Sequence, residues 1–382
     1  MKKQKICIIG GGLTGLITAI TLSKLNCDID LIVGDINQNL KSNRTIAISE
    51  NNFDFLNKLN ISKSFKNEMW SCSVMKLYTE IQNKNFSEIF ELNRENKKGK
   101  ILYMIENSKM IKLMINKINK TKSISVKSNL KVRSIFNSGL LKGIKFNNSV
   151  SKYNLIIICT GSKSDLIKKN FNDKIIENSY NELAITTILG HKEFKNNIAR
   201  QIFLENEILA LLPISRSKTS IVWSVKNFIT KKNNSFIKRK IAFYAKTYLK
   251  NIKFLTKIEY KDLNFLVRNK YYSERILLLG DTLHMIHPFA GQGFNMTLRD
   301  LASLKKLLTQ KINLGLDIGS SDILSEFSSE TKPRNFAFSM GIDLLKNSLS
   351  NEKLRNETLK ILNKSKVAKD VFFDIADKGF RF

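Results

Sequence analysis

The sequence predicts an α/β protein: a Rossmann-like nucleotide-binding domain interleaved with a smaller α+β domain on a mixed β-sheet, followed by a helical C-terminal tail. Three observations predict it. A glycine-rich turn separates an apolar strand from a helix near the N-terminus, a second apolar strand ends in glycine at residues 276–280, and mixed strand-like runs lie between them. The 382 residues exceed the roughly 150 that one domain typically uses.

The N-terminal segment indicates a βαβ unit, in which strands pair in parallel. Residues 5–9 and 29–33 are short apolar runs, and residues 13–25 carry apolar side chains at helical spacing. A helix over 109–119 and a buried strand over 153–159 are expected in the same domain. The nucleotide-binding domain is assigned residues 1–70, 100–178 and 266–320, the smaller domain 71–99 and 179–265, and the tail 321–382, with a helix break at Pro333.

The formal net charge of +31 is spread over the whole chain. It forms no arginine tract and no aromatic stripe of the kind that grips bases, so no nucleic-acid partner is predicted. The charge reflects either a compositional bias towards lysine and asparagine or peripheral binding to an anionic membrane. The four cysteines form no CxxC pair, which fits a reducing cytoplasm. Glycines interrupt the apolar N-terminus, so neither a signal peptide nor a spanning helix is expected.

The pattern Gly10-x-Gly12-x-x-Gly15 lies directly between the first strand and its helix. In such loops the first glycine permits a tight turn, the second lets a pyrophosphate approach the backbone, and the third allows helix and strand to pack closely. The helix N-terminus offers N–H groups to the phosphates. Gly10, Gly12, Leu13, Thr14 and Gly15 are therefore predicted to bind a dinucleotide.

The acidic residue that usually holds the adenosine ribose is displaced in this sequence. The second strand ends at Val33-Gly34-Asp35, so Val33 stands where the acid is expected. Asp35 either reaches the ribose from a longer strand or is a surface turn residue.

Residues 280–295, GDTLHMIHPFAGQGFN, are the most informative stretch. Gly280-Asp281 after an apolar strand resembles the second flavin fingerprint of the p-hydroxybenzoate-hydroxylase class, which implies FAD. More narrowly, residues 287–295 with Arg299-Asp300 resemble the ubiquinone-biosynthesis hydroxylases, as do residues 44–49, 102–107, 211–213 and 221–224. The resemblance places Pro288 and Gly293 near the isoalloxazine ring and adds these cofactor contacts: Arg44, Gly161, Gly280, Asp281, Gly291, Gln292, Gly293, Phe294 and Asn295.

The resemblance implies an FAD-dependent monooxygenase that hydroxylates the aromatic ring of a polyprenylated phenol in ubiquinone biosynthesis. NAD(P)H or a reductase partner would supply electrons, and O2 would react through a flavin C4a-hydroperoxide. The implied location is cytoplasmic, peripheral on the inner membrane or in a biosynthetic complex. Two alternatives stay open: a flavin hydroxylase or epoxidase of a soluble aromatic substrate, and a non-catalytic flavoprotein scaffold.

Two residues depart from the family pattern. Thr160 replaces an aspartate before Gly161, which leaves the electron donor open, and Glu182 stands where glutamine is usual. His284 and His287 lack the spacing of a metal site, so no metal is predicted. The remaining polar and aromatic residues have simpler roles. His191 is expected on the surface or in a loop, Ser162 and Ser164 as helix caps, and Trp70 and Trp223 in packing or beside an aromatic substrate.

Overall fold

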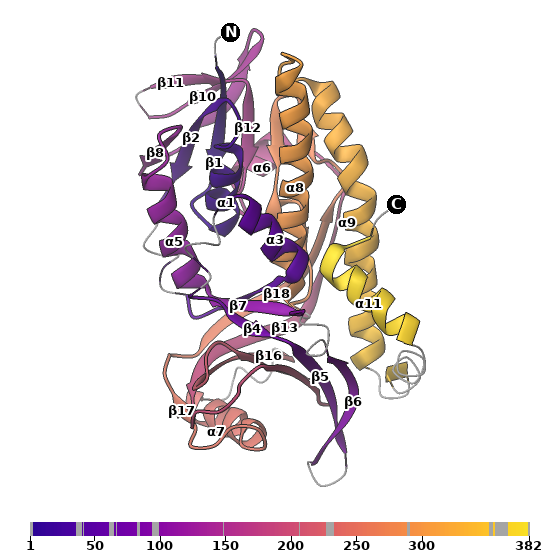
Figure 1. Ribbon diagram of the computed structural model, residues 1–382. Helices are drawn as coiled ribbons and strands as arrows, with labels where there is room; N and C mark the ends of the chain where they lie inside the picture. Colours follow the sequence, from indigo (N-terminus) through magenta and orange to yellow (C-terminus); the bar gives the residue numbers. More distant parts are fainter. Residues whose placement is uncertain are drawn as a thin grey trace.

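The computed structural model (Figure 1) describes most of the chain. The described residues are 3–35, 40, 42–60, 65, 67–81, 85–93, 99–147, 149–205, 207–226, 233–288, 291–350, 354–355 and 366–380.

A six-stranded sheet forms the upper half of the molecule in Figure 1. Its strand order is β19-β20-β12-β1-β2-β8, and all neighbours pair in parallel except β19 and β20. The strands are β1 (Gln4–Ile9), β2 (Cys27–Val33), β8 (Ile124–Ser128), β12 (Leu155–Ile158), β19 (Tyr272–Ser273) and β20 (Ile276–Leu278). The predicted parallel βαβ unit is confirmed.

Three helices pack side by side over this sheet (Figure 1): α1 (Leu13–Leu22), α5 (Asn107–Asn119) and α8 (Gln292–Asn313). Helix α1 is buried from Gly15 to Leu22, which explains why it is apolar around its whole circumference. The short helix α6 (Asp165–Asn170) follows β12. An antiparallel sheet of β9 (Ser134–Ser138), β10 (Leu141–Lys145) and β11 (Val150–Tyr153) adds Ile144 to the same core.

A second, larger sheet forms the lower half, with the order β21-β18-β13-β16-β15-β14-β5-β6, and β17 paired to β13. Ile237 and Ile241 of helix α7 (Asn234–Ala245) pack on one face, around the buried Trp223. Its strands are β5 (Val74–Ile81), β6 (Asn85–Asn93), β13 (Ile175–Gly190), β14 (Ile198–Phe203), β15 (Ile208–Pro213), β16 (Lys218–Lys226), β17 (Lys253–Phe254), β18 (Glu259–Arg268) and β21 (His284–Met285). The domain boundaries expected at 178/179 and 265/266 fall inside β13 and β18, two neighbouring strands of this sheet.

A small sheet of β3 (Thr45–Ser49), β7 (Leu102–Glu106) and β4 (Trp70–Cys72) lies between the two large sheets (Figure 1). Helix α3 (Glu50–Lys58) begins directly after β3. Strand β3 contacts α8 and α3, and β7 contacts α3. Ala47, Cys72 and Leu102 of the small sheet pack with Phe203 of the large sheet, so the small sheet joins the upper core to the lower one.

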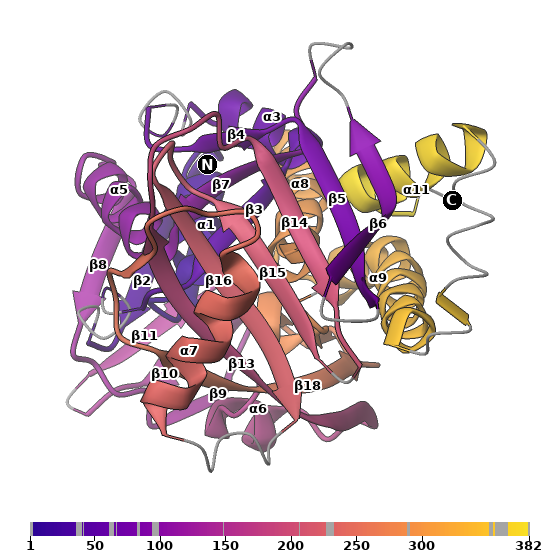
Figure 2. The same ribbon diagram turned by 90° about the horizontal axis from the view of Figure 1, so that it is seen from below.

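In the described part of the C-terminal region, the long helices α9 (Ser321–Ser350) and α11 (Lys366–Lys378) lie beside β5 and β6 when the molecule is seen from below (Figure 2). The predicted helix break at Pro333 is wrong, because α9 continues through this residue. Pro333 is on the exposed side of the helix, where water can satisfy the carbonyl group that the missing N–H leaves unbonded.

Candidate FAD site

The first glycine-rich loop joins β1 to α1 and leaves no room for a side chain at two of its glycines. A Cβ on Gly10, whose φ is +134°, would lie 2.5 Å from the carbonyl oxygen of Cys159, and one on Gly15 would lie 1.9 Å from that of Gly10. At Gly12 a Cβ would meet nothing within 4 Å. Gly12 caps α1, which starts at Leu13 without a side-chain cap or an acidic residue in its first turn. The loop therefore offers free space and N–H groups at Gly12, as a pyrophosphate requires.

The second glycine-bearing loop touches the first. Gly280 begins the 3-10 helix η4 (Gly280–Thr282) with φ +73°, and a Cβ there would lie 2.6 Å from Oγ1 of Thr14 in α1. The hydroxyl of Thr282 donates a hydrogen bond to the Leu279 carbonyl at 2.7 Å. Two segments more than 260 residues apart in the sequence thus lie against each other, as one ligand spanning both would need.

The second loop then runs through Pro288 to the start of α8. Gly291 is the N-cap residue with φ +68°, and a Cβ there would lie 2.7 Å from the Cβ of Ala47. Like α1, this helix has neither a side-chain cap nor an acidic residue in its first turn. Gln292 is buried, and its Oε1 has no hydrogen-bond partner among the residues that the structure describes; a Cβ on Gly293 would meet open space. These features fit a polar ring edge seated at the α8 N-terminus, where negative charge develops on reduction of a flavin.

Asn295 fastens α8 to the small sheet. Its Nδ2 donates to the carbonyl oxygens of Ala47 at 2.9 Å and Gly291 at 3.1 Å, and its Oδ1 accepts from the Ser49 N–H at 3.0 Å. Phe294 is half-buried against the upper core. Both residues were predicted as cofactor contacts, and Asn295 in addition holds the loop in position.

The other predicted contacts border the same region. Arg44 is exposed, and its Nε donates to the Ser42 hydroxyl at 3.2 Å. Asp281 is also exposed, directly after Gly280. Gly161, with φ +81° and open space around its Cβ direction, follows β12, the neighbour of β1. Asp35 is exposed and lies two residues beyond the end of β2.

A buried group of ionisable side chains, His287, Glu182 and Lys346, joins the second loop to β13 and α9. The sequence pattern did not reveal this group. His287 Nε2 lies 3.2 Å from Oε2 of Glu182 in β13, and Lys346 Nζ of α9 lies 2.8 Å from Oε1 of the same carboxylate. Burial lowers the pKa of His287, so the ring is neutral and its Nε2–H donates to Glu182. Burial opposes ionisation of Glu182, but hydrogen bonds from His287 and Lys346 keep its pKa below the ordinary value. The sequence flagged Glu182, but it gave no signal for Lys346.

The two histidines do not converge on one point. Nε2 of His284 lies 2.8 Å from Oδ2 of Asp300 in α8, and Oδ1 of Asp300 accepts from Asn335 at 2.8 Å. Within the described residues, no group of three or more His, Cys, Asp or Glu side chains is arranged to hold a metal ion. His284 therefore ties the loop to α8, whereas His287 ties it to β13.

Three other sequence-based expectations have clear outcomes. His191 lies in the loop directly after β13, one of its two expected positions, but its side chain is buried and not on the surface, with Nε2 2.9 Å from the Thr219 hydroxyl. Trp223 is fully buried and donates to Glu207, which confirms its packing role. Ser164 is the N-cap residue of α6, although its side chain makes no capping hydrogen bond.

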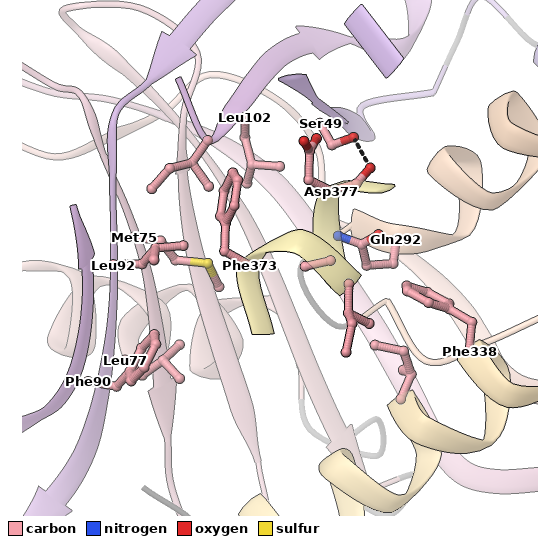
Figure 3. A pocket seen from close by; sticks show the side chains of 14 residues that line it. Ser49, Met75, Leu77, Phe90, Leu92, Leu102, Gln292, Phe338, Phe373 and Asp377 are labelled. Atoms are coloured by element: carbon pink, nitrogen blue, oxygen red, sulfur yellow. Dashed lines mark hydrogen bonds between the residues drawn. The ribbon is translucent and has the colours of Figure 1, made fainter. Parts of the chain in front are cut away.

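An apolar cavity of about 70 Å³ lies beside the α8 N-terminus (Figure 3). Gln292, Ser49 and Asp377 form its polar corner, and Phe373 of α11 lies among the lining side chains near Met75 and Leu102. The Ser49 hydroxyl donates to the Asp377 carbonyl at 3.0 Å, which joins the end of α11 to β3. The cavity is thus bounded by the large sheet, by the second loop and by both C-terminal helices.

The family model for squalene epoxidase matches residues 152–365, more than half of the chain. The chain belongs to the squalene epoxidase family. The match includes most of the large sheet and the whole second loop. Within the described residues, no helix combines the length and apolar composition needed to cross a membrane.

This squalene epoxidase family chain is also similar to curated proteins of ubiquinone biosynthesis. It is 23% identical to the mitochondrial ubiquinone biosynthesis monooxygenase COQ6 of Dictyostelium discoideum, over 97% of this chain and 90% of that protein. The Caenorhabditis elegans COQ6 is 25% identical over 88% and 86%. Ubiquinone hydroxylase UbiL of Rhodospirillum rubrum is 23% identical over 66% and 60%. The resemblance predicted from the motifs is confirmed.

Solved structures of flavin monooxygenases share the fold of this family member. p-Nitrophenol 4-monooxygenase PnpA from Pseudomonas putida DLL-E4 has a TM-score of 0.81 at 14% identity, covering 100% of this chain and 99% of that one. PqsL from Pseudomonas aeruginosa, a probable FAD-dependent monooxygenase, has a TM-score of 0.78 at 13% identity, covering 94% and 99%. The predicted α/β architecture with a helical C-terminal region is confirmed.

Proposed function

We propose that this chain is an FAD-dependent monooxygenase that hydroxylates the aromatic ring of a polyprenylated phenol in ubiquinone biosynthesis. The contact of Gly280 with Thr14 carries the proposal, because it brings both flavin-type loops to one site. The names of the relatives, ubiquinone biosynthesis monooxygenase and ubiquinone hydroxylase, support the substrate class.

The residues present fit FAD. The pyrophosphate would lie at Gly10, Gly12 and the N-terminal N–H groups of α1, and the ribityl chain near Asp281. The ring would lie near Pro288 and the α8 N-terminus, where the amide of Gln292 has an unsatisfied oxygen. When bound, FAD supplies the activation of O2 and the transfer of one oxygen atom.

The protein's own contribution is to orient the phenol and to exclude water. The cavity beside Gln292 is apolar, so it favours an aromatic ring over water. The unpaired Oε1 of Gln292 is an acceptor for the phenolic hydroxyl or for a polar edge of the flavin ring. A buried acceptor of this kind orients a hydroxyl because leaving it unpaired costs free energy.

The cavity must enlarge to admit its substrate. Its volume of about 70 Å³ is smaller than the roughly 150 Å³ of an engineered cavity that binds benzene. Of the α11 residues that line the cavity, Phe373, Ile375, Ala376 and Asp377, Phe373 has the largest side chain. We therefore assign Phe373 as the side chain that moves when the phenol enters.

The finer points of the proposal concern electrons and location. NAD(P)H is the proposed donor, or a reductase partner in view of Thr160. Peripheral association with an anionic membrane would bring the enzyme to a prenylated substrate, and the net charge of +31 favours it. We keep residues 1–70, 100–178 and 266–320 as the cofactor domain, 71–99 and 179–265 as the substrate domain, and 321–382 as the C-terminal segment.

The test uses purified FAD-loaded protein, NADPH, ¹⁸O₂ and prenylated phenols in phospholipid vesicles, with product analysis by mass spectrometry. The proposal expects one ¹⁸O atom in a ring hydroxyl. Hydroxylation of soluble phenols alone would contradict the substrate class. A flavin that dithionite reduces but that yields no hydroxylated product from either kind of phenol would contradict the monooxygenase itself.

A further inference from the structure

Strand β18 spans the candidate FAD site from one side to the other. Near its start, Oε1 of Glu259 accepts from the N–H of Asn43 at 2.9 Å, next to Arg44. At its end, the N–H of Arg268 donates to the Leu283 carbonyl of the second loop at 2.9 Å. The middle of β18 therefore lies between the segment that contains Arg44 and the second loop. Its side chains on the face of Glu259 are candidates to contact a ligand held by these two segments.

The strand register fixes which side chains these are. Lys261 lies two residues after Glu259, and alternate residues of a strand point to the same face. Glu182 of β13 is paired with Leu263, two residues further on, and directly paired residues share a face. Glu182 contacts His287 of the second loop, so the face that carries Lys261 is the one turned to that loop.

The Lys261 ammonium has no partner within the described part of the chain. It makes no hydrogen bond or ion pair there, although the side chain is solvent-exposed. Burial of the ammonium among surrounding protein atoms, and then the nearby Arg44, lower the pKa of Lys261, whereas Asp281 opposes the shift. Two cations, Lys261 and Arg44, thus lie close enough to interact, with the carboxylate of Asp281 nearby. The carboxylate of Glu259, two residues before Lys261 on the same face, accepts from the Asn43 N–H.

We propose that Lys261 is a cofactor-binding residue contributed by the large sheet, whose ammonium contacts bound FAD and balances the negative charge that the flavin gains on reduction. This inference rests on the proposed function. The position supports it, because Lys261 lies between the Arg44 segment and the loop expected to hold the isoalloxazine ring. A nearby cation stabilises the reduced, anionic flavin more than the oxidised form, so it raises the midpoint potential.

The experiment measures the FAD dissociation constant by flavin fluorescence and the flavin midpoint potential by dye-coupled reduction, without substrate. Lys261→Met removes the charge at nearly the same length, and Lys261→Arg keeps it. Lys253→Met is the matched control, because Lys253 is an exposed lysine of the same sheet on β17. The Lys261→Met variant is expected to bind FAD about tenfold more weakly, as expected for the loss of one charge-assisted contact, and to have a lower potential. The Arg variant and the control should keep both values.

The inference is overturned if Lys261→Met folds with an unchanged melting temperature and keeps the wild-type dissociation constant and potential. Weaker FAD binding and a lower potential that Lys253→Met reproduces would overturn it as well, since the loss of any lysine charge would then have the same effect. If the wild-type protein itself binds no FAD, the proposed function fails instead, and the two failures are distinguishable.

Discussion

The two loops of the candidate FAD site are built in different ways. The loop after β1 is shaped by close backbone packing: Gly10 lies against the Cys159 carbonyl oxygen, and Gly15 lies against that of Gly10. The loop after β20 is held by side chains from remote elements: Glu182 of β13 bonds His287, and Asn295 reaches β3. The first loop therefore depends on the absence of side chains, and the second depends on buried polar partners that only the complete fold brings together.

The largest effect is expected at the first loop. Gly15→Ala should lower the free energy of unfolding by about 3 kcal/mol or more, because the new Cβ meets backbone that cannot move aside. Alanine normally stabilises a helix relative to glycine, so a loss of stability in Gly15→Ala would itself point to the steric clash. Gly12→Ala is the matched variant: urea denaturation should show wild-type stability, since its Cβ meets nothing. FAD binding by Gly12→Ala should nevertheless weaken, because the methyl group occupies the proposed pyrophosphate position.

Equal stability of Gly15→Ala and Gly12→Ala would contradict the steric account of the first loop. If Gly12→Ala bound FAD with wild-type affinity, the proposed position of the pyrophosphate at Gly12 would be wrong.

A smaller effect is expected for Asn295→Ala in the second loop. The change leaves the buried Ser49 N–H without its acceptor and the Ala47 carbonyl without its donor. The expected loss of unfolding free energy is on the order of 2–3 kcal/mol, measured by urea denaturation. Asn313→Ala, at the exposed end of the same helix, is the control and should change little. A wild-type value for Asn295→Ala would show that the second loop holds its shape without this anchor.

The smallest of the three effects is expected for Glu182→Gln. The amide still accepts hydrogen bonds, but it removes the negative charge that pairs with Lys346, so about 1–2 kcal/mol should be lost at pH 7. The folded-state pKa of Glu182 is lowered, so its stabilisation is present above the ordinary value near 4.5 and is lost as the pH falls through the folded-state value. The difference between variant and wild type should therefore shrink in acid.

The control for this pH profile is Glu177→Gln, an exposed position on the same strand. The lowered pKa of His287 adds a second pH dependence of stability. Below the ordinary pKa of 6.5, His287 binds a proton more readily in the unfolded chain than in the folded protein. Stability of the wild type should accordingly decline as the pH falls below about 6.5. A difference between Glu182→Gln and wild type that stays constant from pH 7 to pH 4 would contradict the assigned ionisation.

The sequence predicted what depends on local spacing. The glycines of the first loop, the parallel βαβ unit and the Gly280-Asp281 segment are local patterns, and the structure brings them together. The partners of His287 could not be predicted, because Glu182 and Lys346 are distant in sequence and carry no spacing that links them. Lys261 could not be predicted as a site residue for a similar reason: the face on which its side chain lies depends on the register of β18 against β13. The continuity of α9 through Pro333 depends on its exposure, which the sequence does not give.

The most direct test of the central claim is a titration of the purified protein, freed of bound cofactor, with FAD, followed by absorbance and flavin fluorescence. The account predicts saturation at one FAD per chain, with weaker binding for both Gly12→Ala and Gly280→Ala, one variant from each loop. Absence of saturable binding, or binding that a change in only one loop weakens, would contradict a single FAD molecule held by both loops.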